Sequence, residues 1–209
     1  MRRRQPSPRR AEPPGSVRII GGRWRGRRIE IIPAVELRPT PDRVRETLFN
    51  WLVPVLPGAR CLDLYAGTGA LGLEALSRGA AESWFVERDA RTAAAIEATL
   101  KRLSDPGKES AAEARGAVPG RVLATDARRW LGKPPLTTFS LVFLDPPYAA
   151  NNLADLCTLL ARGWLTEHAT VYLETSRSQS LPALPEGWHL HRESQAGDVR
   201  FALATVRSS

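Results

Sequence analysis

The order of apolar and polar residues predicts alternating strands and helices over most of the chain. Short apolar runs indicate strands at 60–65, 82–87, 121–125, 139–144 and 169–174. The first four are followed by segments in which apolar residues recur at helical spacing, which predicts helices at 70–78, 89–103, 127–131 and 152–162. Strands that alternate with helices form mostly parallel sheets covered on both faces, so the pattern predicts a Rossmann-like α/β fold.

A different pattern precedes the alternating region. Apolar runs at 17–20 and 28–32 flank a glycine-rich turn, which predicts a β-hairpin with Trp24 and several arginines at its tip. A helix is then expected up to about residue 53, with Thr40 as its N-cap and Pro41 as its first residue.

The chain ends in a third pattern. Runs at 188–194 and 199–206, joined at Gly197-Asp198, predict a hairpin that closes one edge of the sheet. The connection at 104–120 is rich in Gly, Ala, Pro and charged residues and is longer than most loops.

The length bounds the domain organisation, because 209 residues hold one domain with a full core and leave little room for a second. We expect a basic disordered arm at 1–16 and a single domain at 17–209. Within that domain, 17–57 is expected to form a hairpin and helix extension, and 58–209 the core.

Positive charge is concentrated at the start of the chain. Residues 1–28 hold ten arginines and one acid, Glu12, whereas the other 181 residues hold 20 basic and 21 acidic side chains. Arginine forks pair with phosphates and displace their counterions, so this segment suits a polyanion such as a nucleic acid. The alternative for residues 1–10 is a solvated tail that aids solubility.

Composition also disfavours several classes of protein. The chain contains no apolar run near the roughly 18 residues that span a bilayer, and its Arg- and Pro-rich start is unlike a secretory signal. Its two cysteines, Cys61 and Cys157, lie in apolar runs, and its three histidines lack ligand spacing. Disulfides and a metal site are therefore disfavoured. We expect a cytoplasmic protein with neither a metal nor a membrane partner.

A glycine-rich segment after the strand at 60–65 predicts a ligand site. Gly67, Gly69 and Gly72 match G-x-G-x-x-G, and Glu87 lies twenty residues beyond Gly67, a pattern typical of dinucleotide sites. However, Asp63 at the end of the preceding strand would repel a pyrophosphate. It would attract a ligand with an ammonium and a sulfonium, as in S-adenosylmethionine. A tight turn without a ligand is the structural alternative.

Two further acids stand at strand ends. Glu87 can accept hydrogen bonds from ribose hydroxyls of either cofactor. Asp126 can accept from an adenine amino group, with the Ala127 amide facing a ring nitrogen. Singly, each acid can be a helix N-cap, but acids at successive strand ends favour a ligand site, since open α/β sheets bind ligands there. The expected cofactor site comprises Asp63, Ala66, Gly67, Gly69, Glu87, Asp126 and Ala127.

The segment Leu141-Val-Phe-Leu-Asp-Pro-Pro-Tyr148 carries the most specific signal. Its two prolines fix the backbone after a buried strand and remove two amide donors, which leaves the Asp145 carboxylate and the Pro146 carbonyl as acceptors. Such a turn can grip the hydrogens of an exocyclic base amine and aim the nitrogen lone pair at a methyl group. Tyr148 can stack on the extruded base. The structural alternative is a rigid turn with Tyr148 as packing.

With these motifs in this order, the chain resembles class I methyltransferases that act on exocyclic amines. More narrowly, it resembles the bacterial RsmD family of small-subunit rRNA guanine-N2 methyltransferases. The matching stretches lie within about 17–206 and include Arg18-Ile-Ile-Gly-Gly-Arg-Trp-Arg-Gly26, Leu37-Arg-Pro-Thr-Pro-Asp-Arg-Val-Arg-Glu46, Asp63-Leu-Tyr-Ala-Gly-Thr-Gly69 and Asp145-Pro-Pro-Tyr148. The chain departs from the family pattern in four places. The arm is an extension that the pattern does not require, the 104–120 loop is long, and Pro41 and Thr99 stand where Thr and Asn are expected.

The resemblance implies a seven-stranded sheet whose last strand is antiparallel, with an N-terminal hairpin and helix. It also implies S-adenosylmethionine as cofactor and one guanine of 16S rRNA, within an assembling small subunit, as substrate. Asp145 and Pro146 would hold the guanine amine, with Tyr148 against the base. Residues expected to touch the RNA or lie beside the pocket are Arg23, Trp24, Arg25, Arg38, Thr40 and Arg43. For Arg38 and Arg43, salt bridging at the helix start is the alternative.

Three other functions stay open from the residues alone. The acceptor can be an adenine N6 or a cytosine N4, because the Asp-Pro-Pro-Tyr chemistry permits any exocyclic amine. The glycine pattern also permits an NAD-type oxidoreductase. A protein that only binds RNA is the third alternative, against which the complete set of acids and prolines argues.

Overall fold

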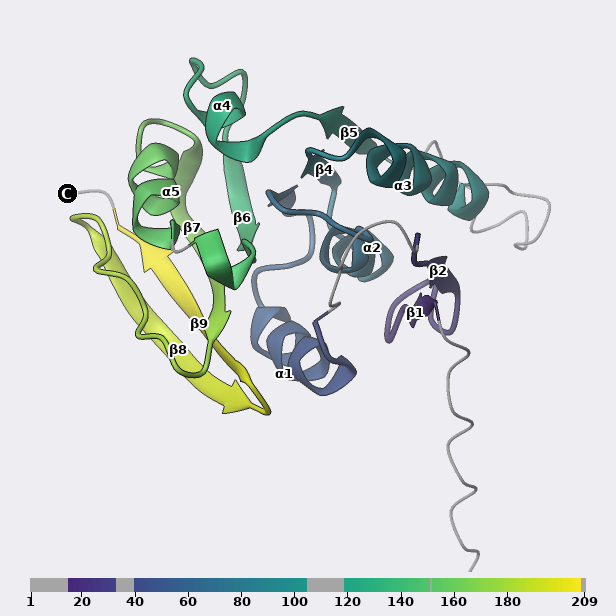
Figure 1. Cartoon of the computed structure of the whole chain (residues 1–209), viewed down its shortest axis with the longest axis horizontal. Coiled ribbons are helices and arrows are strands. Elements are labelled where there is room, and N and C mark those ends of the chain that lie inside the picture. The colour runs from purple at the N-terminus through teal and green to yellow at the C-terminus, as the bar shows by residue number, and fades with distance from the viewer. Residues whose placement is uncertain (1–14, 33–39, 105–118, 151, 208–209) are drawn as a thin grey trace, which may run out of the picture.

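A seven-stranded sheet with helices on both faces forms the body of the protein (Figure 1). The computed structural model describes residues 15–32, 40–104, 119–150 and 152–207. The strands are β3 (Arg60–Asp63), β4 (Glu82–Glu87), β5 (Gly120–Ala124), β6 (Phe139–Leu144), β7 (Leu165–Ser176), β8 (Trp188–Ala196) and β9 (Val199–Val206). The helices are α1 (Asp42–Leu52), α2 (Ala70–Ser77), α3 (Ala90–Leu103), α4 (Ala127–Leu131) and α5 (Leu153–Leu160), with a 3₁₀ turn, η2, at Tyr148–Ala150.

The strand order is β5-β4-β3-β6-β7-β9-β8. The first five in this order are mutually parallel, whereas β9 runs antiparallel between β7 and β8. The prediction of a mostly parallel sheet with an antiparallel last strand and a closing C-terminal hairpin is therefore confirmed. β7 is longer than the expected 169–174, because it begins at Leu165 beside Phe139 and continues past the pairing with β6.

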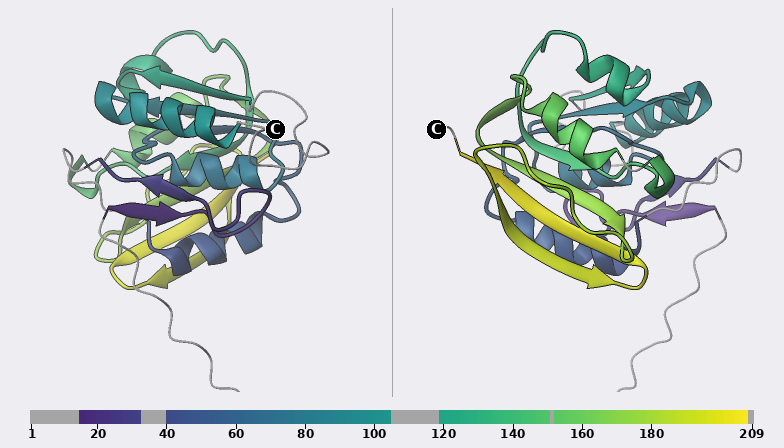
Figure 2. Two further views of the ribbon diagram at one scale, coloured as in Figure 1. Left: turned by 90° about the vertical axis from the view of Figure 1, so that its right-hand side faces the viewer. Right: turned by 60° about the vertical axis from the view of Figure 1, so that its left-hand side comes forward.

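Successive residues of each central strand point to opposite faces, and this places two helix layers (Figure 2). In β6, Val142 and Leu144 belong to the apolar cluster under α4 and α5. Leu141 and Phe143 belong to the cluster under α1 and α2 on the other face. All four are fully buried, which explains why the strand reads as a continuous apolar run.

The predicted N-terminal hairpin is also present. β1 (Ser16–Arg18) pairs antiparallel with β2 (Arg28–Glu30), so pairing begins one residue inside the expected arm. The hairpin loop contacts the second half of α2, where the Ile20 and Gly21 amides both donate to the Glu74 carboxylate, each at 2.7 Å. The hairpin is therefore part of the domain core.

A buried ion-pair cluster fixes this arrangement. The fully buried Arg45 of α1 donates to the Arg18 carbonyl (2.9 Å) and to the Asp42 carboxylate, and its Nη1 lies 3.7 Å from the fully buried Glu74. Arg78 pairs with the other Glu74 oxygen at 2.7 Å. Glu74 thus joins the hairpin, α1 and α2 through one side chain, and Asp42 and Arg45 of the Asp-Arg-Val-Arg-Glu stretch have a structural role in this cluster.

Two local predictions are wrong. Thr40 does not cap α1: the N-cap is Pro41, without a side-chain hydrogen bond, because the Thr40 hydroxyl faces Asp145 and Glu174 instead. Trp24 lies in the hairpin loop, as predicted, but it is 1% exposed and packs in a cluster with α2 and α3, so its side chain is not available to RNA as expected. Residues 1–14 of the predicted arm and residues 105–118 of the predicted loop lie outside the described residues.

Candidate active site

The carboxyl ends of the five parallel strands form a row of acids. In their order across the sheet, these acids are Asp126, Glu87, Asp63, Asp145 and Glu174. Neighbouring strands lie about 4.8 Å apart, so the row extends over roughly 19 Å of the sheet edge. Open α/β sheets bind ligands at this edge. The row therefore marks the candidate site.

The predicted glycine turn lies at the centre of this row. The Gly67 amide donates to Glu87 Oε2 (2.9 Å), which holds the turn against the end of β4. Gly69 forms the N-cap of α2 with a φ of 76°, in the left-handed region that side chains disfavour. At Gly72 a Cβ atom would come within 2.3 Å of the Phe85 ring. Glycine at these positions lets α2 begin close to the sheet.

Asp63 is a buried carboxyl beneath this turn, 3% exposed. Its Oδ2 accepts a hydrogen bond from the Gly72 amide at 3.0 Å, so it also fixes the start of α2. Burial raises the pKa of Asp63 to about 7; the Gly72 hydrogen bond lowers it and the nearby Glu87 charge raises it. A buried carboxyl with this pKa gains most from a ligand that brings positive charge.

Glu87 and Asp126 both accept hydrogen bonds from backbone amides of turns at this edge of the sheet. Glu87 accepts from the Gly67 amide and, through Oε1, from the Asp89 amide at 2.8 Å. Asp126 accepts a hydrogen bond from the Arg129 amide at 2.9 Å and is the N-cap of α4. The alternative interpretation of this residue, a helix N-cap, is therefore correct. Each carboxylate oxygen has further lone pairs. These contacts therefore leave acceptor capacity for a ligand.

The Asp-Pro-Pro-Tyr turn lies next to the glycine turn, because β6 pairs with β3. Pro146 is buried, Pro147 is exposed, and the Ala150 amide donates to the Pro147 carbonyl at 2.8 Å to close η2. Burial raises the pKa of Asp145 well above its usual range, and the charges of Glu174 and then Asp63 add to this, while a hydrogen bond from Thr40 lowers it. The Tyr148 hydroxyl donates to Glu174 Oε1 at 2.9 Å.

Glu174 is the member of the row that the motifs did not reveal. It lies on β7, 3% exposed, and accepts hydrogen bonds from Tyr148, Tyr172 and Thr40. The signal that would have found it is the one that marked the other acids, a single carboxylate near the end of an apolar strand, here Val171-Tyr-Leu-Glu174.

The residues expected to contact RNA are only partly brought to the row. Thr40 lies there, 3.3 Å from Asp145 Oδ2, and Arg43 is exposed in the first turn of the adjoining α1. Arg23 and Arg25 are exposed but belong to the hairpin loop, whose neighbour Trp24 donates its amide to Ser77 at the last residue of α2. That is the end of α2 opposite to the glycine turn. Trp24 itself is buried, and Arg38 lies outside the described residues.

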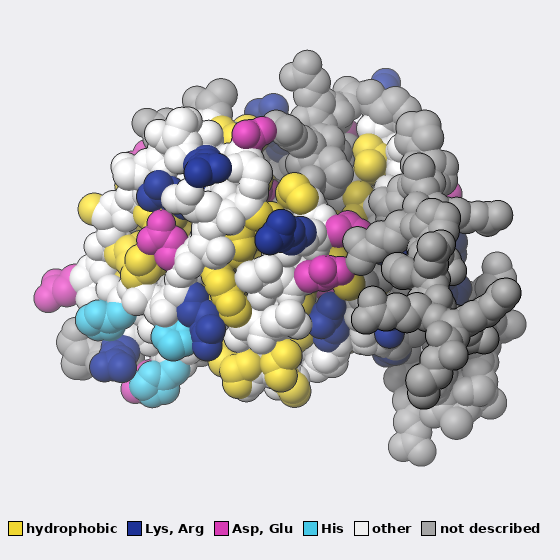
Figure 3. Space-filling model, turned by 90° about the horizontal axis from the view of Figure 1, so that it is seen from below, with side chains coloured by type: hydrophobic (Ala, Val, Ile, Leu, Met, Phe, Trp, Pro, Cys, Tyr) yellow, Lys and Arg dark blue, Asp and Glu magenta, His cyan; other side chains and the backbone are white. Residues whose placement is uncertain are grey.

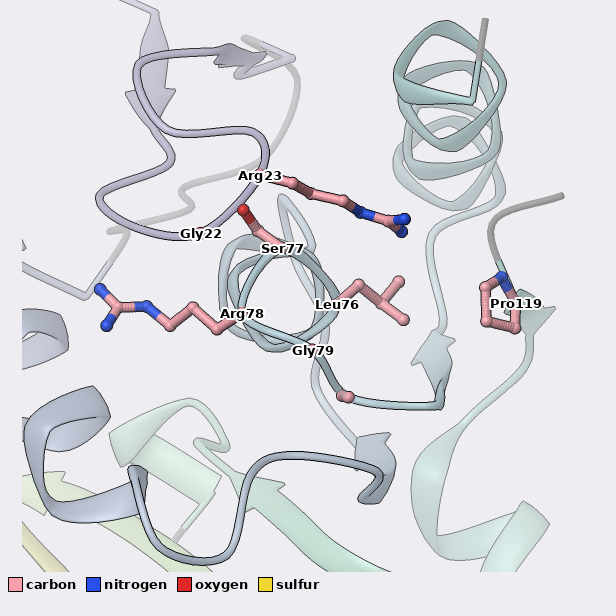
Figure 4. A pocket seen from close by; sticks show the side chains of 8 residues that line it. Gly22, Arg23, Leu76, Ser77, Arg78, Gly79 and Pro119 are labelled. Atoms are coloured by element: carbon pink, nitrogen blue, oxygen red, sulfur yellow. The ribbon is translucent and has the colours of Figure 1, made fainter. Parts of the chain in front are cut away.

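A separate cavity of about 560 Å³ lies near Arg23, at the far end of α2 (Figure 4). Its lining includes Gly79, Ala80 and Pro119, which precede the amino ends of β4 and β5. The Arg23 and Arg78 side chains point away from each other there (Figure 4), so their charges do not converge on one ligand. This cavity is remote from the row of acids.

Two findings concern metals and membranes. Histidine side chains gather at one margin of the face shown in Figure 3. Within the described ranges, no group of three or more His, Cys, Asp or Glu side chains is arranged to hold a metal ion. Among the helices described, none is both long and apolar enough to cross a membrane.

Comparisons with known proteins agree with this geometry. The chain is 43% identical to the Ribosomal RNA small subunit methyltransferase D of Escherichia coli (strain K12) over 190 residues, 90% of this chain and 89% of that protein. The solved structure of yhhF from Escherichia coli matches with a TM-score of 0.81 and 40% identity, over 93% of this chain and all of that one.

An RNA methyltransferase from Salinibacter ruber, solved in complex with S-adenosyl-L-homocysteine, shares the fold at 18% identity and a TM-score of 0.56. It covers 82% of this chain and 95% of its own. The family model described as conserved hypothetical protein 95 matches residues 17–205. The resemblance drawn from the motifs is thereby confirmed, and the chain belongs to the conserved hypothetical protein 95 family, that of the RsmD methyltransferases.

Proposed function

We propose that this protein transfers a methyl group from S-adenosylmethionine to N2 of a guanine in small-subunit ribosomal RNA. One observation carries the proposal: the Asp145-Pro146 turn lies directly beside the glycine turn on neighbouring strands, within one row of acids. This arrangement supports an amine-binding site next to a site for a cationic donor. The name of the Escherichia coli relative supports ribosomal RNA as the substrate.

The residues of the glycine turn fit S-adenosylmethionine. Asp63 is a buried carboxyl whose pKa is raised by burial, and a nearby sulfonium or ammonium would favour its ionised form. Asp63, Ala66, Gly67 and Gly69 would hold the methionine part, Glu87 the ribose, and Asp126 with Ala127 the adenine. When bound, the cofactor supplies an electrophilic methyl group.

The chain itself acts mainly on the amine. The lone pair of a guanine N2 is delocalised into the ring, so the nitrogen is a poor nucleophile. The Asp145 carboxylate and the Pro146 carbonyl accept hydrogen bonds from its two N–H groups, which favours a pyramidal nitrogen with its lone pair aimed at the methyl carbon. Tyr148, held by Glu174, would lie against the base. Asp145 must be ionised for this role.

We further propose that the substrate is rRNA within an assembling small subunit, in the cytoplasm, where Arg43 and the exposed hairpin arginines would contact phosphates. The family match favours methyl transfer over the NAD-type alternative left open by the glycine pattern. The experiment below decides whether the methyl acceptor is guanine N2 or an adenine or cytosine amine.

The test uses ribosomal RNA from a strain lacking this protein. Mass spectrometry identifies the missing methyl group, and a fragment carrying that site is then methylated in vitro. Replacing the target guanine by inosine, which lacks the 2-amino group, should abolish transfer. Asp145→Ala should abolish transfer with cofactor affinity retained, whereas Asp155→Asn, an exposed acid on α5, should behave as wild type. Full activity of Asp145→Ala, or methylation of the inosine fragment, would contradict the proposal.

A further inference from the structure

Glu174 is a second carboxylate beside Asp145, on the neighbouring strand. β6 and β7 are parallel and Leu144 pairs with Leu173, so the acids that follow these two residues lie at the same level of the sheet edge. Glu174 is 3% exposed. A carboxylate so buried is stable only when it is hydrogen-bonded or protonated. Its partners therefore determine its charge.

Three hydroxyl groups reach Glu174. Tyr148 donates to Oε1 (2.9 Å), Tyr172 donates to Oε2 (2.7 Å), and Thr40 Oγ1 lies 3.3 Å from Oε2. The same Thr40 oxygen lies 3.3 Å from Asp145 Oδ2. A threonine hydroxyl has one proton, so it can donate to only one carboxylate at a time. The second contact becomes a hydrogen bond when the other carboxyl is protonated and donates to Oγ1.

Asp145, Thr40 and Glu174 therefore have two complementary arrangements that differ in the place of one proton. Either Asp145 carries it and Thr40 donates to Glu174, or Glu174 carries it and Thr40 donates to Asp145. Burial raises the pKa of both carboxyls, and the charge of Glu174 raises the pKa of Asp145 further. Asp63, on the other flanking strand, acts on Asp145 in the same direction. The pair is thus suited to hold one proton.

We propose that Glu174, acting through Thr40, takes up the proton that the guanine amine releases on methylation, and thereby keeps Asp145 an acceptor. The proposal rests on the methyl transfer proposed above. N2 forms a bond to the methyl carbon, and sulfur retains the electron pair of the bond that breaks. One N–H bond of the charged amine then breaks, its electrons return to nitrogen, and its proton passes to Asp145. Both carboxylates are ionised before the transfer, so Thr40 Oγ1 can accept this proton while giving its own to Glu174, which later releases it to water.

Glu174 is a positioning residue in this scheme, so its test needs more than a loss of rate. Three variants are compared at saturating substrate across pH: Glu174→Gln, Thr40→Val and Thr40→Ser. Glu174→Gln and Thr40→Val should lower kcat at least about tenfold, with cofactor Kd within twofold of wild type. Thr40→Ser, which keeps the hydroxyl, should restore kcat. Thr158→Val, on the exposed side of α5, is the matched control.

The pH profile separates this role from simple packing. Activity should fall at low pH as Asp145 becomes protonated and no longer accepts the amine hydrogen. Glu174→Gln removes the charge that raises the Asp145 pKa, so this limb should move to lower pH. A folded Glu174→Gln variant that has the kcat of wild type, and whose activity falls at the same low pH as that of wild type, would overturn the proposal. If that variant does not fold, equal kcat for Thr40→Val and wild type overturns it instead.

A readout independent of RNA keeps the two proposals apart. The Asp145 carboxyl carbon, labelled with ¹³C, is titrated by NMR in wild type and in Glu174→Gln. The proton-sharing pair predicts a lower Asp145 midpoint in the variant. Identical titrations overturn the role of Glu174 even if methyl transfer is found, whereas a shifted midpoint without any methyl transfer by the wild type contradicts the proposed function alone.

Discussion

Cofactor affinity should depend on pH through Asp63. The pKa of this buried carboxyl is raised to about 7 in the cofactor-free protein, and a cationic ligand binds its ionised form. The ionised fraction is about one half at pH 7 and about 3% at pH 5.5. S-adenosylmethionine affinity should therefore fall about 16-fold between pH 7 and pH 5.5, a loss of about 1.6 kcal/mol. The amino group of the cofactor stays protonated throughout this range.

Calorimetric titration measures both parts of this prediction. Kd is followed from pH 5.5 to pH 7, and repeating the titration at pH 6 in buffers of different ionisation enthalpy gives the protons exchanged. Binding at pH 6 should release about 0.9 proton.

Two variants serve as controls for this titration. Asp63→Asn, whose side-chain oxygen can still accept from the Gly72 amide, should bind more weakly at pH 7 and show no pH slope. Asp145→Asn removes the neighbouring carboxyl on β6 and should keep the slope. A flat wild-type profile, or a slope that persists in Asp63→Asn, would refute the assignment.

Three further predictions concern stability and RNA binding. Glu74→Gln breaks a fully buried ion pair and should cost about 3–5 kcal/mol, which lowers the melting temperature by at least about 6 °C. Glu82 is half-buried and its ion-pair partner Arg60 is exposed, so Glu82→Gln should change stability by less than about 1 kcal/mol, and equal shifts in the two variants would contradict the difference in burial. Gly72→Ala should destabilise by about 1–3 kcal/mol, because its methyl group meets the Phe85 ring, and an unchanged thermal melt would argue against that contact. Deleting residues 1–14 removes five arginines and should reduce the salt slope of RNA binding by up to about 3.5 without lowering the melting temperature; an unchanged slope would identify the arm as a solvated tail.

The truncation must stop before residue 15, which the sequence alone did not indicate. Residues 1–28 look like one basic segment, and removing all of them would seem a fair test of RNA binding. In the structure, however, Val17, Ile19, Trp24 and Ile29 are buried in the core with α2 and α3. A longer deletion would unfold the protein and lower RNA affinity for that reason alone.

The fold followed from periodicity because each central strand is short, apolar and next to a turn signal. The glycine turn and the Asp-Pro-Pro-Tyr turn could be predicted because each is continuous in sequence, and Glu87 and Asp126 because each follows an apolar strand. Thr40 was expected beside the pocket only through the family resemblance, and its contact with Asp145 was not foreseen. Glu174 was missed, because only the pairing of β6 with β7 brings it to Asp145. Arg45 was missed for a related reason, since a charged helix residue reads as exposed until Glu74 is found beside it.

Glu74 also has a consequence for how the protein can be divided. α2 is eight residues long, about 12 Å; it begins at the glycine turn and ends at Ser77, which accepts a hydrogen bond from the Trp24 amide of the hairpin loop. Loosening of the hairpin therefore acts on the same short helix that shapes the proposed methyl-donor site. A minimal enzyme for engineering, or for fusion to another RNA-targeting module, should begin near residue 15. A version trimmed to 58–209 should bind the methyl donor more weakly and should also be less stable.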